Sequence, residues 1–131
     1  ELIDELLASL EVQHLKDGEY LMRAGDEADD MFFVQDGAVT AQLEREDGRI
    51  IRLETMGKGR AGGERGFYLN QQRTAAVVSS GESIVYRLTK ERLAEIEDQQ
   101  PEIASTMHRL IVHLLSDRVT HLVGVVNVLQ Q

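Results

Sequence analysis

The chain has 131 residues, of which 42% are hydrophobic, and this is enough for one domain with a proper core. Its net charge of -9 disfavours a nucleic-acid surface, because such a surface needs clustered Lys and Arg. With no cysteine, the chain has no disulfide, zinc–cysteine site or thiol catalysis. We expect no membrane insertion, since the apolar run 122–129 is interrupted by Gly124 and Asn127. The chain opens on Glu1, and we expect it to be one domain of a longer protein.

Residues 1–10 predict a short amphipathic helix, because their apolar residues recur at helical spacing. From Val12 onward, short apolar runs alternate with glycine turn signals, which indicates many short antiparallel strands. Asp36-Gly37 and Asp47-Gly48 each lie between strand-like runs, so both predict tight hairpins. With two more strands expected over 73–79 and 83–88, the total is roughly eight, which favours a mainly β fold of the jelly-roll or β-roll kind.

After Leu88 the pattern becomes helical. Thr89 is a predicted N-cap for a helix over 90–98, and Pro101 stands where a first helical turn tolerates proline. A long last helix follows, because apolar residues continue at helical spacing from Ile103 to Leu129. This stripe could pack on the β-roll or pair with the same helix of a second subunit to form a homodimer, and the sequence leaves both open.

The most informative segment is Gly63-Glu64-Arg65-Gly66-Phe67-Tyr68-Leu69, followed by Arg73-Thr74-Ala75. A glycine-bounded turn that opens into a short helix exposes backbone N–H groups, and an arginine from the next strand can neutralise a phosphate through two parallel hydrogen bonds. Glu64 could accept a hydrogen bond from a sugar hydroxyl. Within 58–73 four basic residues stand against Glu64 alone, so an acidic chain carries one locally cationic loop. The alternative is a solvated loop whose arginines balance the acidic surface.

Other chemistries find little support in the sequence. The strands offer only His14 for a metal inside the barrel. His113, Asp117 and His121 recur every four residues on the last helix, where a wet polar face is the simpler interpretation. No Ser–His–acid arrangement stands out, so we expect neither a metal site nor catalysis.

The aromatic pair Phe67 and Tyr68 admits two interpretations. Both side chains could stack on a base. Aromatic residues in a short helix more often anchor that helix onto the barrel, and we expect this role.

Spaced glycines and strands occur in a recognisable order over 15–19, 25–29, 32–34 and 36–37, before the Gly-Glu pair and the Arg-Thr-Ala triplet. In this order the chain resembles the cyclic nucleotide-binding domain family, which includes the sensor half of catabolite activator proteins and the regulatory modules of kinases and ion channels. The resemblance implies one domain over 1–131. Its parts would be an N-terminal helix (1–10), a β-roll (11–88) with a phosphate cassette (59–75), and C-terminal helices (89–131).

The resemblance also implies a function and a role for each site residue. The domain would be a non-catalytic regulatory module with no cofactor, whose ligand is cAMP or cGMP. Glu64 would bind the ribose 2′-hydroxyl and Arg73 the cyclic phosphate, with Arg65 as a further phosphate candidate. Thr74 would lie near the phosphate or the base, and the backbone amides around Gly66 and Ala75 would bind the remaining phosphate oxygens.

Two departures from the family pattern support a rival interpretation. The family usually has bulky apolar residues where this chain has Ala61-Gly62, and an apolar residue where it has Arg65. The rival is a degenerate β-roll that binds no nucleotide and serves for dimerisation or interaction.

A narrower resemblance concerns four segments: 66–69, 86–88, 101–104 and 108–109. They are similar to the domain at the cytoplasmic C-terminal end of some bacterial sulfate permease-type transporters. This resemblance implies a cytoplasmic regulatory part of an anion transporter, in which residues 89–131 relay ligand occupancy.

Overall fold

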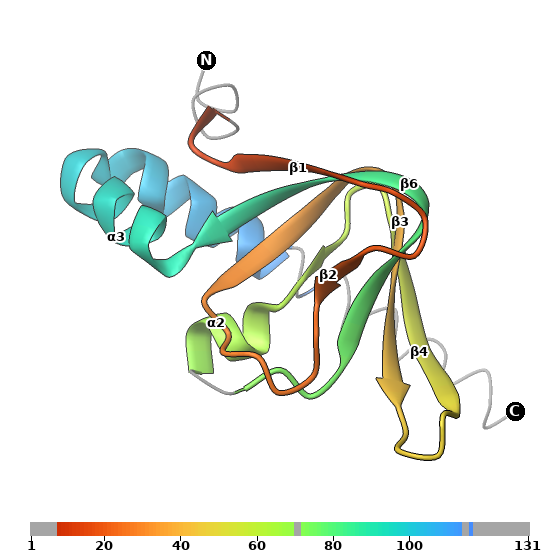
Figure 1. The fold of residues 1–131 in the computed structure, drawn as a ribbon. Helices are drawn as coiled ribbons and strands as arrows, with labels where there is room; N and C mark the ends of the chain where they lie inside the picture. The colour runs from red at the N-terminus through yellow and green to blue at the C-terminus, as the bar shows by residue number, and fades with distance from the viewer. Residues whose placement is uncertain (1–7, 70–71, 114–115, 117–131) are drawn as a thin grey trace, which may run out of the picture.

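The computed structural model describes residues 8–69, 72–113 and 116. The expected N-terminal helix and the far part of the last helix therefore lie outside the described residues, apart from the ends that adjoin them. Six strands and two helices have assigned bounds (Figure 1): β1 (Glu11–Leu15), β2 (Tyr20–Met22), β3 (Asp30–Glu44), β4 (Ile50–Gly57), β5 (Ala61–Gly62), α2 (Glu64–Leu69), β6 (Ala76–Thr89) and α3 (Lys90–Gln99). A further helix begins at Pro101 and is described as far as residue 113.

The sheet is antiparallel and is organised by its two longest strands. Its order is β1-β6-β3-β4, while β2 pairs with β6 and β5 pairs with β3. β3 and β6 span 15 and 14 residues, and each bends so that its two halves belong to different parts of the roll (Figure 1). The expected mainly β fold of the β-roll kind is confirmed. The number of strands was overestimated, because β3 and β6 each join two runs that the sequence predicted as separate strands.

The predicted hairpin at Asp36-Gly37 is wrong. β3 continues through this pair, and its register with β6 shifts on either side of Asp36. Gly37 has a φ of 77°, and a Cβ there would overlap the carbonyl oxygen of Glu82 on β6. A glycine can adopt this conformation and allow this approach, so Asp36-Gly37 forms a bulged corner at which two strands bend together.

The second predicted hairpin is confirmed. β3 pairs with β4 from Ala38↔Gly57 to Glu44↔Ile50, and the turn is closed by hydrogen bonds between Arg45 and Arg49 and between Gly48 and Arg45. Gly48 supplies the positive φ, 88°, that such a turn requires.

Two apolar clusters fill the two faces of β3. Phe32 and Val34 point into the roll, where they contact residues of β2, β4 and β6. Met31 points the other way, into a second cluster, which includes side chains of α2, α3 and the helix after Pro101 and which we call the helical cluster. Successive residues of a strand point to opposite faces, so this part of β3 is buried on both sides. The strand thus separates the interior of the roll from the helical layer.

The C-terminal helices follow the sequence prediction as far as they are described. Thr89 Oγ1 accepts a hydrogen bond from the backbone N–H of Arg92 at 3.0 Å and caps α3. Pro101 is the first residue of the next helix, and Ile103, Met107 and Ile111 are buried against the helical cluster. The apolar stripe therefore packs on the roll over this stretch. Its continuation to Leu129 lies outside the described residues.

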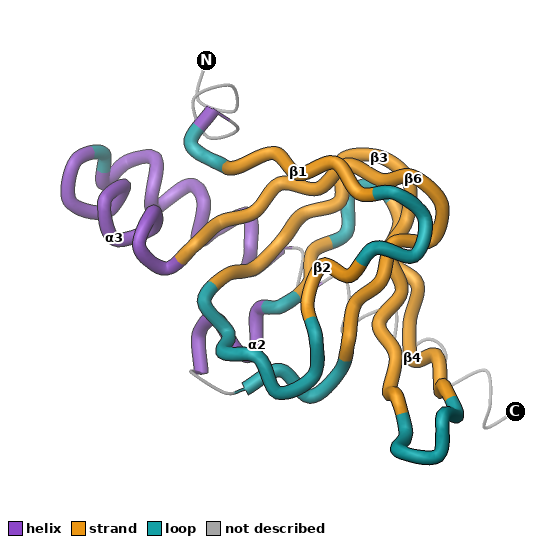
Figure 2. Tube along the Cα trace, viewed as in Figure 1, coloured by secondary structure: helices purple, strands orange, loops and turns teal. Residues whose placement is uncertain are grey.

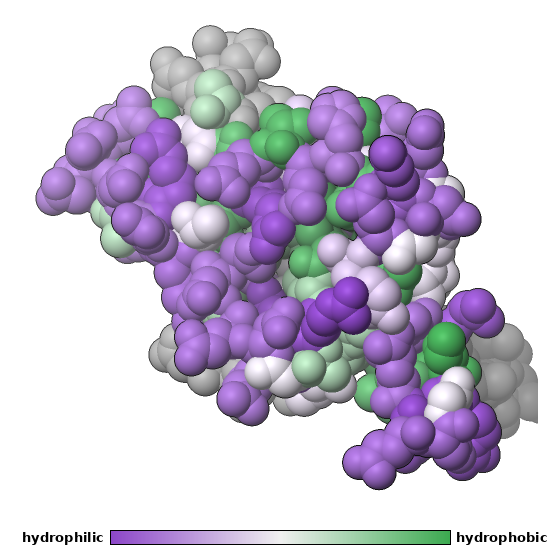
Figure 3. All heavy atoms as spheres, in the orientation of Figure 1, coloured by the Kyte–Doolittle hydropathy of each residue, from purple (hydrophilic) through white to green (hydrophobic). Residues whose placement is uncertain are grey.

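The surface agrees with the acidic composition. The face drawn in Figure 3 is mostly hydrophilic, with apolar residues showing near its centre. Within the described part of the chain, no helix is both long enough and apolar enough to cross a membrane.

Gly37→Ala tests the bulged corner. We expect it to lower the free energy of unfolding by at least about 3 kcal/mol, because the methyl group adds a clash with β6 to the strain of a positive φ. Gly48→Ala is the matched control: its φ is similar, nothing lies within 4 Å of a Cβ there, and the expected loss is about 1 kcal/mol. Urea denaturation of both variants measures the two free energies of unfolding. Equal losses would contradict the close approach of β6 to Gly37.

Candidate functional site

A cavity of about 240 Å³ lies where the predicted cassette meets the roll. Gly62, Gly63 and Glu64 line it from the cassette, and Gln72, Arg73, Thr74 and Ala75 line it from the segment before β6. β4 contributes Leu53, Glu54 and Met56. Small-molecule sites usually span roughly 300–1,000 Å³, so this cavity is just below that range.

The cassette helix forms as the sequence predicted. α2 begins at Glu64, immediately after Gly63, whose φ of 84° turns the chain. The N–H of Phe67 donates to the carbonyl of Gly63 at 3.1 Å, and the Phe67 side chain is buried in the helical cluster. Phe67 therefore anchors α2 on the roll, as expected from its position.

Phe32 explains one of the departures from the family pattern. A Cβ at Gly62 would overlap the Phe32 ring, which is 1% exposed. The ring of Phe32 thus occupies the space next to Gly62, and a larger residue there would have to displace it. The small residue at Gly62 is therefore required by the packing of Phe32 in this chain.

Arg73 reaches the cavity from a loop, because β6 begins three residues later, at Ala76. Its backbone is fixed to the loop between β2 and β3: Arg73 N–H donates to Asp26 C=O at 2.9 Å, and Gly25 N–H donates to Arg73 C=O at 2.8 Å. Figure 2 shows these two loops and α2 gathered at one end of the roll. The sequence placed Arg73 on a strand, and this detail was wrong.

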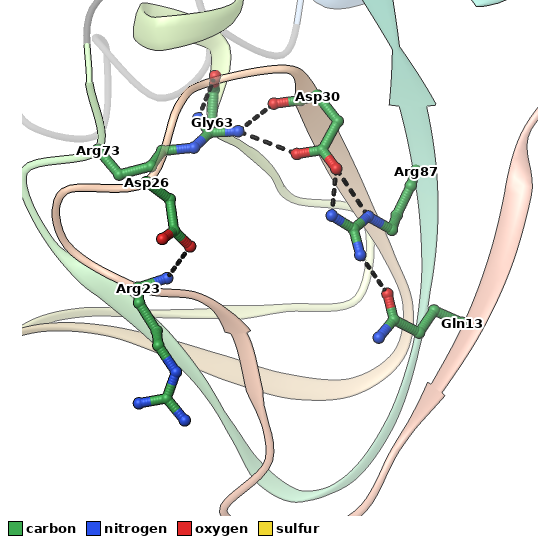
Figure 4. Close-up of polar contacts among 7 residues, drawn as sticks. All are labelled: Gln13, Arg23, Asp26, Asp30, Gly63, Arg73 and Arg87. Carbon is green, nitrogen blue, oxygen red and sulfur yellow. Dashed lines mark hydrogen bonds and ion pairs between the residues drawn. The ribbon is translucent and has the colours of Figure 1, made fainter.

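The guanidinium of Arg73 is held by protein acceptors (Figure 4). Nη1 donates to the carbonyl oxygen of Gly63 at 2.8 Å. Nη2 donates to the backbone oxygen of Asp30 and, at 3.0 Å, to Asp30 Oδ1. The Arg73 side chain is 6% exposed. A guanidinium has five N–H donors, so these three acceptors do not exhaust its capacity for a ligand at the cavity wall.

Asp30 also binds a second arginine. Its Oδ2 accepts from Nε of Arg87 at 2.8 Å and from Nη2 of the same residue. Arg87 in turn donates from Nη1 to Oε1 of Gln13 at 2.7 Å. Asp30, Arg87 and Gln13 were not among the site residues predicted from the sequence.

Strand register explains why these three residues meet. Phe32 pairs with Arg87 across β3 and β6, which makes Asp30 the diagonal neighbour of Arg87 on the same face. Val85 pairs with Gln13 across β6 and β1, which makes Gln13 the next diagonal neighbour. Asp30 and Arg73 are 43 residues apart in the sequence, so their ion pair could not be predicted from local sequence patterns.

The other predicted site residues fall into two groups. Glu64, Thr74 and Ala75 line the cavity, as Arg73 does. Arg65 and Gly66 lie within α2, and only their backbone is described. Among the described residues no group of His, Cys, Asp and Glu could hold a metal ion. The metal motif weighed at His113, Asp117 and His121 lies mostly outside the described residues.

Tyr68 connects the cassette to the C-terminal helices. Its hydroxyl oxygen lies 3.0 Å from Nδ1 of His108, on the helix that begins at Pro101. Burial and the nearby charge of Glu97 raise the pKa of Tyr68, so the hydroxyl is protonated at neutral pH, and the tautomer of His108 decides which of the two groups donates. Tyr68 is thus a contact between α2 and the last helix.

A larger hollow of about 550 Å³ lies beside α3 and the last helix, with Glu97, Ala104 and His108 in its wall. None of the described residues that the sequence predicted for the site lines it. The smaller cavity is the candidate site, because the cassette turn and Arg73 both line it.

The chain is thus a β-roll with C-terminal helices, a short cassette helix and a buried arginine at the wall of a cavity. The sequence model described as "Cyclic nucleotide-binding domain" matches residues 12–100. The chain belongs to the cyclic nucleotide-binding domain family. Domains of this family are typically regulatory and non-enzymatic.

Individual relatives agree with this assignment. Cyclic nucleotide-gated channel alpha-4 of Mus musculus is 30% identical over 112 residues, which are 81% of this chain and 19% of the channel. The cAMP-activated global transcriptional regulator Vfr of Pseudomonas aeruginosa is 28% identical over 109 residues, 80% of this chain and 51% of Vfr. The chain therefore corresponds to part of each relative.

A solved structure supports the fold alone. The cyclic nucleotide-binding domain from Methylobacillus flagellatus superposes with a TM-score of 0.80 at 18% identity, covering 92% of this chain and 67% of that one.

Arg73→Met tests whether the guanidinium stabilises the fold without a ligand. We expect a loss of about 2–4 kcal/mol in the free energy of unfolding, because buried acceptors at Gly63 and Asp30 lose their donors. Arg49→Met removes an ion pair whose side chains are 78% and 55% exposed, and should change the value by less than about 0.5 kcal/mol. Urea denaturation without nucleotide compares the two free energies of unfolding. A small loss for Arg73→Met would contradict a stabilising role for the contacts of Arg73 with Gly63 and Asp30.

Proposed function

We propose that the chain is a regulatory sensor for a purine 3′,5′-cyclic monophosphate, cAMP or cGMP. Arg73 and the backbone amides near Gly66 and Ala75 bind the cyclic phosphate, and Glu64 binds the ribose 2′-hydroxyl. Thr74 lies beside the phosphate or the base, and Arg65 adds positive charge. Membership in the family and the names of the channel and of Vfr support this class of ligand.

The observation that carries the proposal is a buried guanidinium at the wall of a cavity inside an acidic chain. The carbonyls of Gly63 and Asp30 fix the orientation of Arg73 before any ligand arrives. A preorganised cation at a partly desolvated site binds an anion more strongly than a mobile surface arginine does. Glu64, at the first turn of α2, lines the same cavity and supplies an acceptor for a hydroxyl.

Two contacts support a relay from the site to the helices. Tyr68 of α2 contacts His108 on the last helix, and the N–H of Lys90, the first residue of α3, donates to the carbonyl of Asp29. A ligand that repositions α2 or the Asp29-Asp30 segment would thus shift the packing of the C-terminal helices. Such a shift requires different affinities for the two packings.

The proposal also concerns the rest of the protein: the domain would be fused to an anion transporter of the sulfate permease type. This part of the proposal rests on the likeness of segments 66–69, 86–88, 101–104 and 108–109 to the regulatory domain of those transporters. The domain would then act at the cytoplasmic face of a membrane protein.

The rival function is a nucleotide-independent interaction or dimerisation module. The engagement of Arg73 by Asp30 and Gly63 favours it, because the phosphate must compete with bonds that the protein already makes. The packing of Phe32 against Gly62 disfavours it, because the cassette has kept a compact structure.

Isothermal titration calorimetry with cAMP and cGMP separates the two functions. We expect micromolar binding of at least one nucleotide, weakened at least about tenfold in Arg73→Lys, because lysine keeps the charge but loses the forked geometry. Arg49→Lys is the control and should bind normally. Absence of heat with both nucleotides would sink the sensor and leave the interaction module.

Glu64→Gln tests the ribose contact separately. We expect it to weaken cAMP about tenfold and to leave 2′-deoxy-cAMP unchanged, since that analogue lacks the hydroxyl. Glu46→Gln, on the exposed hairpin turn, is the control. Equal losses for both ligands would show that Glu64 acts on something other than the ribose.

A further inference from the structure

The Asp30 carboxylate is shared between two arginines, and this sharing bears on how Arg73 can bind a ligand. Oδ1 lies 3.0 Å from Nη2 of Arg73, and Oδ2 accepts from Nε and Nη2 of Arg87 (Figure 4). The Asp30 side chain is 13% exposed. At this depth charges are weakly screened, so the three groups influence one another strongly.

We propose that Asp30 is an internal counter-ion that competes with the ligand phosphate for Arg73, and that Arg87 limits this competition by binding the other carboxylate oxygen. Asp30 and Arg87 are positioning residues that act through Arg73. Together they set the affinity for the nucleotide. This inference rests on the proposed function, since it concerns the same cavity.

Arg73 does not depend on the Asp30 charge for its position. Nη1 binds the carbonyl of Gly63, and Nη2 also binds the backbone oxygen of Asp30. Asparagine at position 30 has the shape of aspartate and an amide oxygen that can still accept from Nη2. Asp30→Asn therefore removes a negative charge beside Arg73 with little change in shape, and its cost falls on Arg87, whose Nε and Nη2 lose the Oδ2 acceptor.

The charge arithmetic gives opposite signs for the two residues. With Asp30 neutral, the net charge of the three side chains rises from +1 to +2, and an anionic phosphate binds more tightly. With Arg87 neutral, the whole Asp30 carboxylate is available to Arg73, and the phosphate binds more weakly. A purely structural role for Asp30 predicts instead that both substitutions weaken binding.

Calorimetry on the 131-residue chain with cAMP and cGMP tests this assignment. We expect Asp30→Asn to bind at least one nucleotide about fivefold more tightly than the unsubstituted chain. Asp26→Asn is the matched control: it removes the same charge from the loop just before Asp30, but the Asp26 carboxylate binds only the N–H of Arg23 among the described contacts and is exposed. Its affinity should stay within about twofold.

Arg87→Gln completes the cycle. We expect affinity to fall about fivefold, whereas Arg49→Gln, which removes an equal charge from the exposed hairpin, should leave it unchanged. The double variant Asp30→Asn/Arg87→Gln should return to within about twofold of the unsubstituted chain, because its two charge changes cancel. Loss of packing at either residue would not produce such compensation.

The outcomes distinguish this inference from the proposed function. If the unsubstituted chain binds a nucleotide and Asp30→Asn binds equally or more weakly, Asp30 is not a competing counter-ion, and the sensor function stands. Asp30 is likewise no competitor if Asp26→Asn gains as much affinity as Asp30→Asn. If no variant binds either nucleotide, the sensor function itself is wrong. Binding by Asp30→Asn alone would overturn the sensor function of the unsubstituted chain and identify Asp30 as the group that prevents nucleotide binding.

Discussion

The structure of the site depends on one carboxylate placed between two arginines. Asp30 is the first residue of β3. Its carboxylate contacts Arg73, which lines the cavity, and Arg87, which lies on β6. The Arg73 side chain is 6% exposed and needs acceptors at this depth, because an unpaired buried charge costs several kcal/mol, and Asp30 supplies two of them, its backbone oxygen and Oδ1. The same carboxylate joins Arg73, in the proposed phosphate cassette, to the strand that leads into α3. The candidate anion-binding arginine and the strand before the C-terminal helices are therefore linked through a single residue.

The bent strands make this arrangement possible. β3 and β6 pair from Asp30↔Thr89 at one end to Gln42↔Ala76 at the other, and they bend together at Gly37. One end of this ladder places Asp30 and Arg87 on one face. The other end delivers the chain from Arg73 into β6. Arg73, which precedes β6, thus contacts Asp30, the first residue of β3, across the roll. Phe32 fills the space beside Gly62.

Local features of the site could be predicted from sequence, since they depend on neighbouring residues. The cassette helix after Gly63, the Thr89 cap and the Asp47-Gly48 hairpin are of this kind. The prediction at Asp36-Gly37 failed because the same dipeptide suits a hairpin and a bulged corner, and the partner strand, which is distant in sequence, decides between them. Asp30 was missed for a related reason: strand register, with its shifts at Asp36, selects it from a loop that carries several acidic side chains.

Nitrogen-15 NMR of the arginine side chains in nucleotide-free protein shows whether Asp30 and Gly63 hold Arg73 before any ligand binds. A guanidinium held on two sides rotates slowly about its C–N bonds, so its Nη protons give separate signals. We predict separate Nη signals for Arg73 and Arg87 and averaged signals for the exposed Arg49. Averaged signals from Arg73, like those of Arg49, would contradict the shared carboxylate, because they would mean that Asp30 and Gly63 do not hold the guanidinium in solution.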